Sequence, residues 1–234
     1  MRATHRLHEI AAIAQHRAGY SPEEDAAHEL AAGWMHAAGL ETHVDAGGNL
    51  HGRRGDARVW SGSHLDSVPT AGRFDGALGV VAAIEAAERL PGAPLGVVVF
   101  RAEETGPLGS RRLDELPAAF VELHIEQGPV LAGLGQALGI VTGVAGQTRG
   151  AVVFEGRADH AGTTPMDARD DALVAAATFV LRVRESARGS AVATVGAVEV
   201  EPNAVNVGIV LVEGRRRLGV LREGNGLSRK GQEP

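Results

Sequence analysis

The chain of 234 residues contains no cysteine. This absence excludes disulfides and thiolate metal sites, so any bound metal has to be held by His, Asp and Glu. Aromatic residues make up only 3% of the chain, and the abundant small and branched residues suit helices packed closely on a sheet. Positive charge is also in deficit, because the formal net charge is −6. That balance argues against a nucleic-acid partner.

Long apolar runs are missing as well. No stretch approaches the roughly 18 apolar residues that a membrane helix needs. The first 30 residues are charged throughout and lack the apolar core of a signal peptide. We therefore expect a cytoplasmic protein that binds neither membrane nor nucleic acid.

The first part of the chain alternates between helical and extended patterns. Ser21 followed by Pro22 predicts a helix start, and Gly39 predicts its end. The continuous apolar run 95–100 predicts a buried, parallel strand. The other predicted elements are strands at 41–45, 49–54 and 58–64 and a helix at 76–90. This pattern predicts an α/β domain with a mostly parallel sheet and helices on both faces.

The pattern changes near 141–150, and a strand–helix–strand–strand run follows. Its predicted elements are strands at 151–160, 191–202 and 204–214 and a helix at 171–187. We therefore expect one domain over 1–146, a small α+β domain over 147–214, and a poorly ordered polar tail over 215–234.

Polar residues that could bind a metal or transfer a proton follow the predicted strands. His64 and Asp66 form a His-x-Asp pair in which the carboxylate could orient a metal-ligating His. Asp75 could bridge two metals, although an Asp before Gly is more often a turn residue. Glu103 and Glu104 end an apolar strand, where one could bind metal and the other act as a general base; a solvated strand end is the alternative.

Two further segments carry histidines. Strand alternation would place Glu122, His124 and Glu126 on one face, which suits a polar cleft better than a core. His160 lies in a predicted loop before Gly162 and two hydroxyl residues. It could contact a polar substrate, or it could belong to an ordinary turn.

Taken together and in order, these segments resemble one family. The segments are GSHLDSV, GRFDGALGV, FRAEE, ELHIEQGPVL, GRADHAGTTPMDARDDAL and PNAVNV, within residues 6 to 207. They resemble the amidohydrolase branch of the aminoacylase and carboxypeptidase-type dinuclear metallohydrolases. This branch includes N-carbamoyl-L-amino-acid hydrolase, allantoate amidohydrolase and β-ureidopropionase. The resemblance implies a catalytic domain over 1–146 and a lid and dimerisation domain over 147–214.

The resemblance implies a metal centre. It assigns His64 and His124 as ligands of one metal, Asp75 as the bridging carboxylate, Glu104 as a ligand of the second metal and Glu103 as the general base. The family has two divalent ions, and a set of His and carboxylate ligands suits zinc, manganese, cobalt or nickel.

The resemblance also implies residues around that centre. Asp66 would support His64, and His160 in the lid would reach the reacting carbonyl oxygen. Gln127 and Asn206 would contact the small-molecule substrate. The family forms homodimers through the lid.

Two departures from the family pattern affect the expected activity. The stretch from Glu104 to His124 is much shorter than in the family, and family members continue well past residue 234. The last His ligand of the second metal normally comes from that continuation, whereas His160 is the last histidine here. We therefore expect both domains to be incomplete on their C-terminal side, one bound ion to be possible, and turnover to be weak or absent.

The leading hypothesis is metal-dependent hydrolysis of a linear amide or ureido C–N bond, with N-carbamoyl-L-amino acids as first candidates. One alternative is a non-catalytic remnant that binds or dimerises. A further alternative is allantoate hydrolysis.

Overall fold

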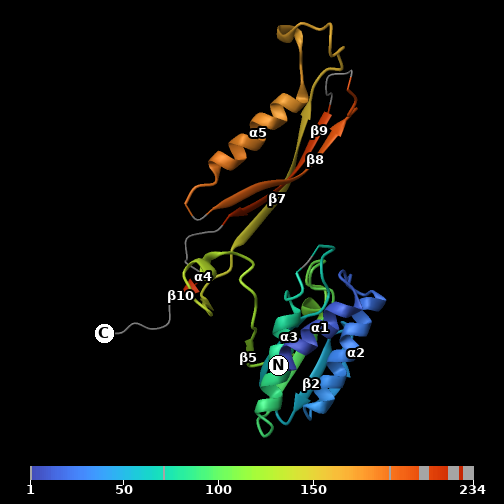
Figure 1. Ribbon diagram of the computed structural model, residues 1–234, viewed down its shortest axis with the longest axis vertical. Helices are drawn as coiled ribbons and strands as arrows, with labels where there is room; N and C mark the ends of the chain where they lie inside the picture. Colours follow the sequence, from blue (N-terminus) through green and yellow to red (C-terminus); the bar gives the residue numbers. More distant parts are fainter. Residues whose placement is uncertain (1, 71, 190, 206–210, 221–226, 229–234) are drawn as a thin grey trace, which may run out of the picture. The chain divides into compact units, whose positions relative to one another are not determined.

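The computed structural model describes residues 2–70, 72–189, 191–205, 211–220 and 227–228 (Figure 1). The chain divides into two compact units, 1–129 and 130–234. Each unit is described by itself. Asn206, one of the predicted substrate contacts, lies outside the described residues.

The first unit contains three helices and a five-stranded sheet. Its elements are α1 (Arg2–Ile13), α2 (Pro22–Ala37), β1 (Glu41–Val44), β2 (Leu50–Arg54), β3 (Val59–His64), α3 (Ala77–Arg89), β4 (Leu95–Phe100), the 3-10 turn η1 (Ser110–Arg112) and β5 (Ala119–Val121). As predicted, Ser21 caps α2, because its side chain accepts a hydrogen bond from the Glu24 N–H.

The strand order in this sheet is β1-β2-β4-β3-β5. β3 pairs in parallel with both β4 and β5, whereas β1–β2 and β2–β4 are antiparallel. The structure therefore confirms an α/β class in which the part of the sheet around β3 is parallel. The carboxyl ends of β3 and β4 meet at one edge of the sheet, where open α/β sheets place their sites.

The core of this unit lies between the helices and one face of the sheet. α1, α2 and α3 contact one another (Figure 1), and their buried apolar residues form one cluster with Leu50, Val97 and Val99. The other face buries Trp60 and Val98, outside that cluster. The described helices thus form one layer, and the prediction of helices on both faces differs from the structure here. The physical reason is that the three amphipathic helices bury their apolar residues against one another.

The second unit has the elements α4 (Val130–Gly133), β6 (Ile140–Val141), β7 (Gly146–Glu155), the turn η2 (Met166–Ala168), α5 (Ala172–Ser186), β8 (Val192–Glu201), β9 (Leu211–Val220) and β10 (Leu227–Ser228). Four of them, β7, α5, β8 and β9, follow one another in the predicted strand–helix–strand–strand order, and α4, β6 and β10 were not predicted. The main sheet of this unit has the order β7-β9-β8, with both pairs antiparallel, and β6 pairs with β10.

The predicted tail begins inside a strand. Residues 215–220 belong to β9, which pairs along its length with β7 and with β8. Residues 215–220 thus have regular strand pairing, and the poorly ordered tail over 215–234 stays a prediction. The sequence there is polar and without period, but pairing on both sides satisfies the backbone N–H and C=O groups whatever the side chains are.

No helix in the described part of the chain has the length and apolar character needed to cross a membrane. The cytoplasmic location stays a prediction.

Candidate metal centre and active site

His64 is the last residue of β3 and is buried at the carboxyl edge of the sheet. Its Nδ1 atom lies 3.3 Å from Asp66 Oδ1 and 3.1 Å from the Asp66 carbonyl oxygen. Donation from Nδ1 to Asp66 leaves Nε2 available as a metal ligand. Asp66 is therefore close enough to orient the His64 ring.

Electrostatics favour a cation at this position. Burial acts to lower the pKa of His64, but the hydrogen bond and charge of Asp66, together with Glu103, raise it to about 9. Burial likewise acts to raise the pKa of Asp66, but the hydrogen bonds from His64 and from two backbone N–H groups lower it. The site thus stabilises positive charge at His64, whether a proton or a metal ion supplies it.

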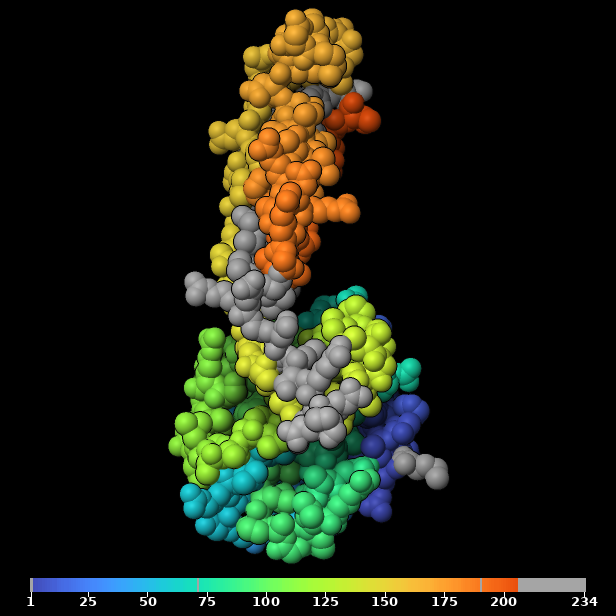
Figure 2. Space-filling view, turned by 90° about the vertical axis from the view of Figure 1, so that its left-hand side faces the viewer, coloured from blue at the N-terminus to red at the C-terminus, as the bar shows by residue number. Residues whose placement is uncertain are grey.

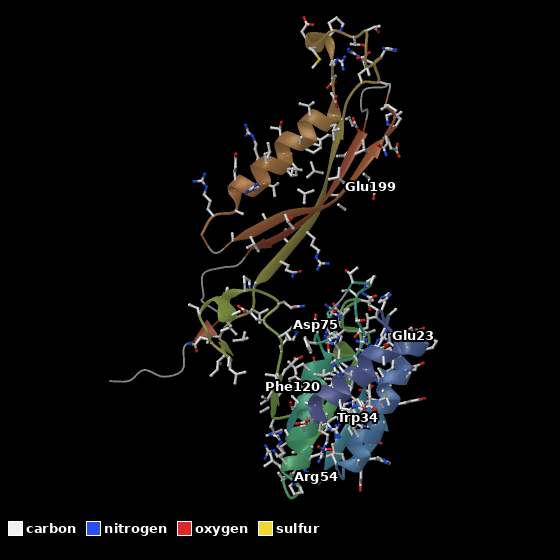
Figure 3. The ribbon with its side chains drawn as sticks, in the orientation of Figure 1. Glu23, Trp34, Arg54, Asp75, Phe120 and Glu199 are labelled. Atoms are coloured by element: carbon white, nitrogen blue, oxygen red, sulfur yellow. The ribbon has the colours of Figure 1, made fainter. Side chains whose placement is uncertain are left out.

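Asp75 and His124 complete a cluster with His64. Each of the three residues offers one ligand atom, and these atoms lie within 4.8 Å of one another. His124 Nε2 is 3.6 Å from Asp75 Oδ1, while His124 Nδ1 lies 2.7 Å from the Ile125 carbonyl oxygen. Figure 3 labels Asp75 at the end of the first unit opposite Arg54. The structure therefore brings His64, Asp75 and His124 together, and their role as ligands stays a prediction.

An unsatisfied oxygen atom supports the metal interpretation. Asp75 Oδ1 is buried and has no hydrogen-bond partner among the described residues. Such an atom is costly unless something compensates it. The other oxygen, Oδ2, accepts a hydrogen bond of 2.6 Å from the Gln127 side-chain amide. A divalent cation bound at His64, Asp75 and His124 would satisfy the free oxygen, so the residues fit the metal that the family implies.

Gly76 makes room for this arrangement. Its φ of +63° lies in the left-handed region, and a Cβ atom there would stand 2.4 Å from the His64 carbonyl oxygen and 2.6 Å from its ring. Only glycine combines that backbone conformation with such a close approach. The turn before α3 can therefore bring Asp75 beside His64 only because residue 76 lacks a side chain.

Glu103 and Glu104 follow β4 at the same edge. Their N–H groups donate to the two Asp66 oxygens at 3.0 and 2.9 Å. Glu103 Oε2 lies 3.8 Å from His64 Nε2, and its side chain is 40% exposed. The pKa of Glu104 is raised, mainly by burial and also by the carboxylates of Asp75, Glu103 and Asp66. The charge of His64 opposes this increase. Glu104 is not part of the three-residue cluster, so its role as a ligand stays a prediction.

The segment from Glu122 to Glu126 is not a strand. β5 ends at Val121, so the predicted strand face with alternating residues is wrong. Instead Glu122 accepts a hydrogen bond of 2.5 Å from the buried Ser63 hydroxyl. A Cβ atom on Gly79, in α3, would stand 2.7 Å from the Leu123 carbonyl oxygen. The segment thus packs against α3 and β3 instead of continuing the ladder, and this packing brings His124 toward Asp75.

His160 belongs to the second unit. Its Nδ1 atom accepts hydrogen bonds from the N–H groups of Gly162 and Thr163, at 3.0 and 3.2 Å. An accepting Nδ1 assigns the ring proton to Nε2. His160 can therefore donate a hydrogen bond from Nε2, as an oxyanion contact requires, and that role stays a prediction.

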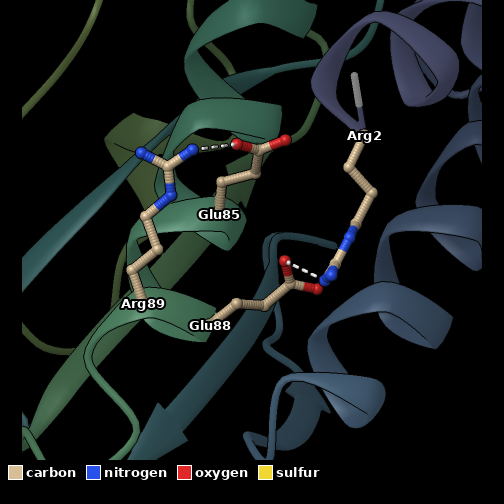
Figure 4. Close-up of a pocket in the computed structure, with 4 residues that line it drawn as sticks. All are labelled: Arg2, Glu85, Glu88 and Arg89. Atoms are coloured by element: carbon tan, nitrogen blue, oxygen red, sulfur yellow. Dashed lines mark hydrogen bonds and ion pairs between the residues drawn. The ribbon is translucent and has the colours of Figure 1, made fainter.

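A pocket elsewhere in the first unit has a different character. Arg2, Glu85, Glu88 and Arg89 line it, between α1 and α3 (Figure 4). Arg2 pairs with Glu88 at 3.0 Å and Arg89 with Glu85 at 3.2 Å. These exposed ion pairs are typical of a helix surface. None of the predicted site residues lines this pocket.

Glu24 was missed as a site-related residue. The sequence gives it only as part of a helix start, yet it is fully buried and accepts a hydrogen bond of 2.9 Å from the Ala102 N–H. A carboxylate at a helix start is ordinarily solvated, so no signal in the sequence distinguishes this one.

Known proteins are similar to this chain in sequence and in fold. Residues 60–206 match the family described as Peptidase family M20/M25/M40. The chain is 36% identical to an N-carbamoyl-L-amino acid amidohydrolase of Geobacillus stearothermophilus, over 82% of this chain and 61% of that protein. It is also 36% identical to an allantoate amidohydrolase of Escherichia coli strain K12, over 80% of this chain and 60% of that protein.

The fold of this chain is also similar to that of a solved structure. A hydantoinase/carbamoylase-family amidase from Burkholderia multivorans superposes with a TM-score of 0.76 at 29% identity, over 93% of this chain and 68% of that one. The chain spans about 60% of the length of each of the two curated relatives. With the family match covering more than half of its residues, the chain belongs to the Peptidase family M20/M25/M40.

Proposed function

We propose that this chain carries the metal centre and general base of a hydrolase that cleaves a linear amide or ureido C–N bond. The observation that carries the proposal is the convergence of His64, Asp75 and His124 within 4.8 Å, beside the Glu103 carboxylate. The amidohydrolases among its relatives support the same reaction class.

The ligands that the chain offers determine which metal ions it can bind. His64, Asp75 and His124 provide two nitrogen atoms and a carboxylate, a set that zinc, manganese, cobalt and nickel all accept. A bound divalent ion supplies Lewis-acid activation of the scissile carbonyl group and of the attacking water. We propose at least one such ion per chain, with Glu104 available to a second.

Glu103 is the general base of the proposed reaction. Its carboxylate faces His64 and is partly open to solvent, so a water molecule can reach it. In the proposed reaction Glu103 takes a proton from the attacking water and returns it to the leaving nitrogen as the C–N bond breaks. His160, with its proton on Nε2, would donate a hydrogen bond to the oxygen on which negative charge develops.

N-carbamoyl-L-amino acids are the first candidate substrates, because the Geobacillus relative is named for them. Allantoate is the second, because the Escherichia coli relative at equal identity is named for it. Both are linear ureido compounds whose hydrolysis releases ammonia.

The test is ammonia release by the chain loaded with Mn²⁺, Zn²⁺, Co²⁺ or Ni²⁺, from several N-carbamoyl-L-amino acids and from allantoate. We expect turnover of the unmodified chain to be weak, and we expect Glu103→Gln to abolish it while leaving metal binding intact. Glu115→Gln is the matched control, because this carboxylate lies in the following loop and is 62% exposed. Metal binding without turnover in the unmodified chain would refute the catalytic proposal and favour a binding fragment.

We also propose that the second unit forms a homodimer through α5. The helix buries Ala172, Ala176 and Val183, and it exposes Val174 and Leu181 on its opposite side. Figure 2 shows α5 (orange) at the surface of this unit. The family resemblance indicates a second copy of the chain as the partner.

A further inference from the structure

The loop after β4 holds its backbone with two carboxylates from different elements. Asp66 accepts hydrogen bonds from the N–H groups of Glu103 and Glu104. Glu24, in the first turn of α2, accepts a hydrogen bond of 2.9 Å from the Ala102 N–H. Three consecutive amide groups are therefore bound to carboxylates. Because the backbone sets the direction of each side chain, this arrangement fixes where Glu103 and Glu104 point.

Ala102 is the residue at which the loop turns. Its φ of +50° lies in the left-handed region, which is uncommon for a residue other than glycine. The residue is fully buried. A strained backbone of this kind persists only where the surrounding structure holds it. The hydrogen bond from Ala102 to Glu24 supplies such a restraint at the strained residue itself.

Glu24 does not serve the start of its own helix in the usual way. Ser21 and Glu24 have the spacing of a capping box, in which the Glu side chain binds the N–H of the capping residue. Here the Ser21 N–H donates to the Ala18 carbonyl oxygen at 3.0 Å instead. The Glu24 carboxylate binds the N–H groups of Tyr20, at 2.5 Å, and of Ala102. Its contacts therefore connect α2 to the two loops beside it.

The environment of Glu24 is costly for a charge. Burial raises its pKa, and the hydrogen bonds from Ala102 and Tyr20 and the charge of Arg101 oppose that rise. Arg101 Nε lies 3.0 Å from Glu24 Oε2, and the Arg101 guanidinium also pairs with Asp25. An apolar side chain would fill the space without this desolvation cost. What a carboxylate adds is the set of hydrogen bonds that fix the loop.

We propose that Glu24 is a positioning residue for the Glu103–Glu104 pair. It acts through the backbone of Ala102 and touches neither substrate nor metal. The proposal rests on the function proposed above for that pair. Glu24 and Asp66 together hold the loop from two sides, so that the general base keeps its place beside His64.

The first experiment measures kcat and KM of the Mn²⁺-loaded chain and its variants. We expect Glu24→Ala to lower kcat about 10-fold or more, with KM within about threefold, because lost support of a metal-site group costs roughly 10–100-fold. Glu24→Gln keeps an amide oxygen that can accept from Ala102, so we expect it to recover part of this loss.

Two controls separate positioning from stability. Glu23→Gln removes the neighbouring exposed carboxylate of the same helix. Arg54→Ala removes hydrogen bonds to the carbonyl oxygens of Ala38, Ala87 and Leu90, at the end of the unit opposite Asp75 (Figure 3). We expect both controls to keep the kcat of the unmodified chain. Equal kcat values for Glu24→Ala and Arg54→Ala would overturn the proposal.

The second experiment does not depend on turnover. If the unmodified chain shows none, the proposed function fails by itself, and amide hydrogen exchange of residues 102–104 decides the role of Glu24. We expect these amides to exchange about tenfold faster in Glu24→Ala, which corresponds to losing roughly one hydrogen bond. We expect no change in Glu23→Gln or Arg54→Ala. Unchanged exchange in Glu24→Ala would overturn the positioning role.

Discussion

At the scale of single residues, the proposed metal centre depends on small groups as much as on its proposed ligands. Asp66 binds His64 on one side and two backbone N–H groups on the other. It thereby links the end of β3 to the end of β4. Gly76 lets the turn before α3 approach His64 closely enough for Asp75 to join the cluster. The proposed ligands are therefore positioned by Asp66 and Gly76, which are not among them.

Gly76→Ala tests this dependence. The new methyl group would stand 2.4 Å from the His64 carbonyl oxygen, and the φ of +63° would be strained for alanine. We expect Zn²⁺ or Co²⁺ affinity, measured by titration calorimetry, to fall by about 10–100-fold. Gly72→Ala is the matched control in the same loop, because a Cβ atom there meets nothing within 4 Å. Equal affinities in the two variants would show that Gly76 does not position His64.

At the scale of elements, the buried side of α2 is ionisable near its start and apolar farther along. Ala27, Ala31 and Met35 join the core, while Glu24 and His28 are buried beside the loop after β4. Burial, followed by the charge of Arg101, lowers the pKa of His28 to about 4, although the charges of Asp25 and Asp66 oppose the decrease. The folded protein therefore holds His28 neutral at a pH at which the unfolded chain would protonate it.

This difference predicts an acid-sensitive stability. With a folded pKa of about 4 and an unfolded value of 6.5, the contribution of His28 is fully present above about pH 6.5 and is lost as the pH falls toward 4. Between pH 7.5 and pH 5.0 the free energy of unfolding should fall by roughly 2 kcal/mol from this group alone. Urea unfolding of His28→Gln should lack that component.

The comparison with a matched variant isolates His28. His36 lies exposed on the same helix, so His36→Gln should keep the pH dependence of the unmodified chain. The raised pKa of His64 has the opposite sign: its contribution is present below about pH 6.5 and is lost as the pH rises toward 9. His64 is common to all these proteins and cancels in their differences. If His28→Gln and His36→Gln showed the same pH dependence, the assignment to His28 would be wrong.

At the scale of the whole molecule, the second unit presents apolar surface that its own sheet leaves uncovered. Leu173, Val174, Val180 and Leu181 of α5 are all exposed. Val174 and Leu181 are seven residues apart and therefore lie on the same side of the helix. This surface matches the homodimer that we propose for the chain.

The double substitution Val174→Glu with Leu181→Glu should convert this dimer to a monomer, because four carboxylates would face one another across a symmetric contact. Sedimentation velocity over a range of concentrations measures the change. Arg182→Glu is the control, since it alters charge on a different side of α5. A monomer in the unmodified chain would contradict the proposed dimer.

Much of the candidate site could be predicted from local sequence. His64, Asp75, Glu103 and Glu104 follow or precede regular elements whose patterns are clear, and parallel strands bring their carboxyl ends to one edge. The extended segment around His124 was predicted incorrectly, because Glu122 binds Ser63 and the chain packs on α3 instead of continuing the ladder. Strand alternation gives no information about such a competing contact.

The sequence by itself determined the α/β class, the strand–helix–strand–strand succession that became β7, α5, β8 and β9, and the residue types that can hold a metal. These follow from hydrophobic period, helix capping and the absence of cysteine, all of which are local or compositional. Only the tertiary structure decided that the helices form one layer, that β9 extends through residues 215–220, and that Glu24 binds Ala102. Each of these depends on a partner distant along the chain, and the backbone and carboxylate groups involved accept many partners with similar energy until packing selects one.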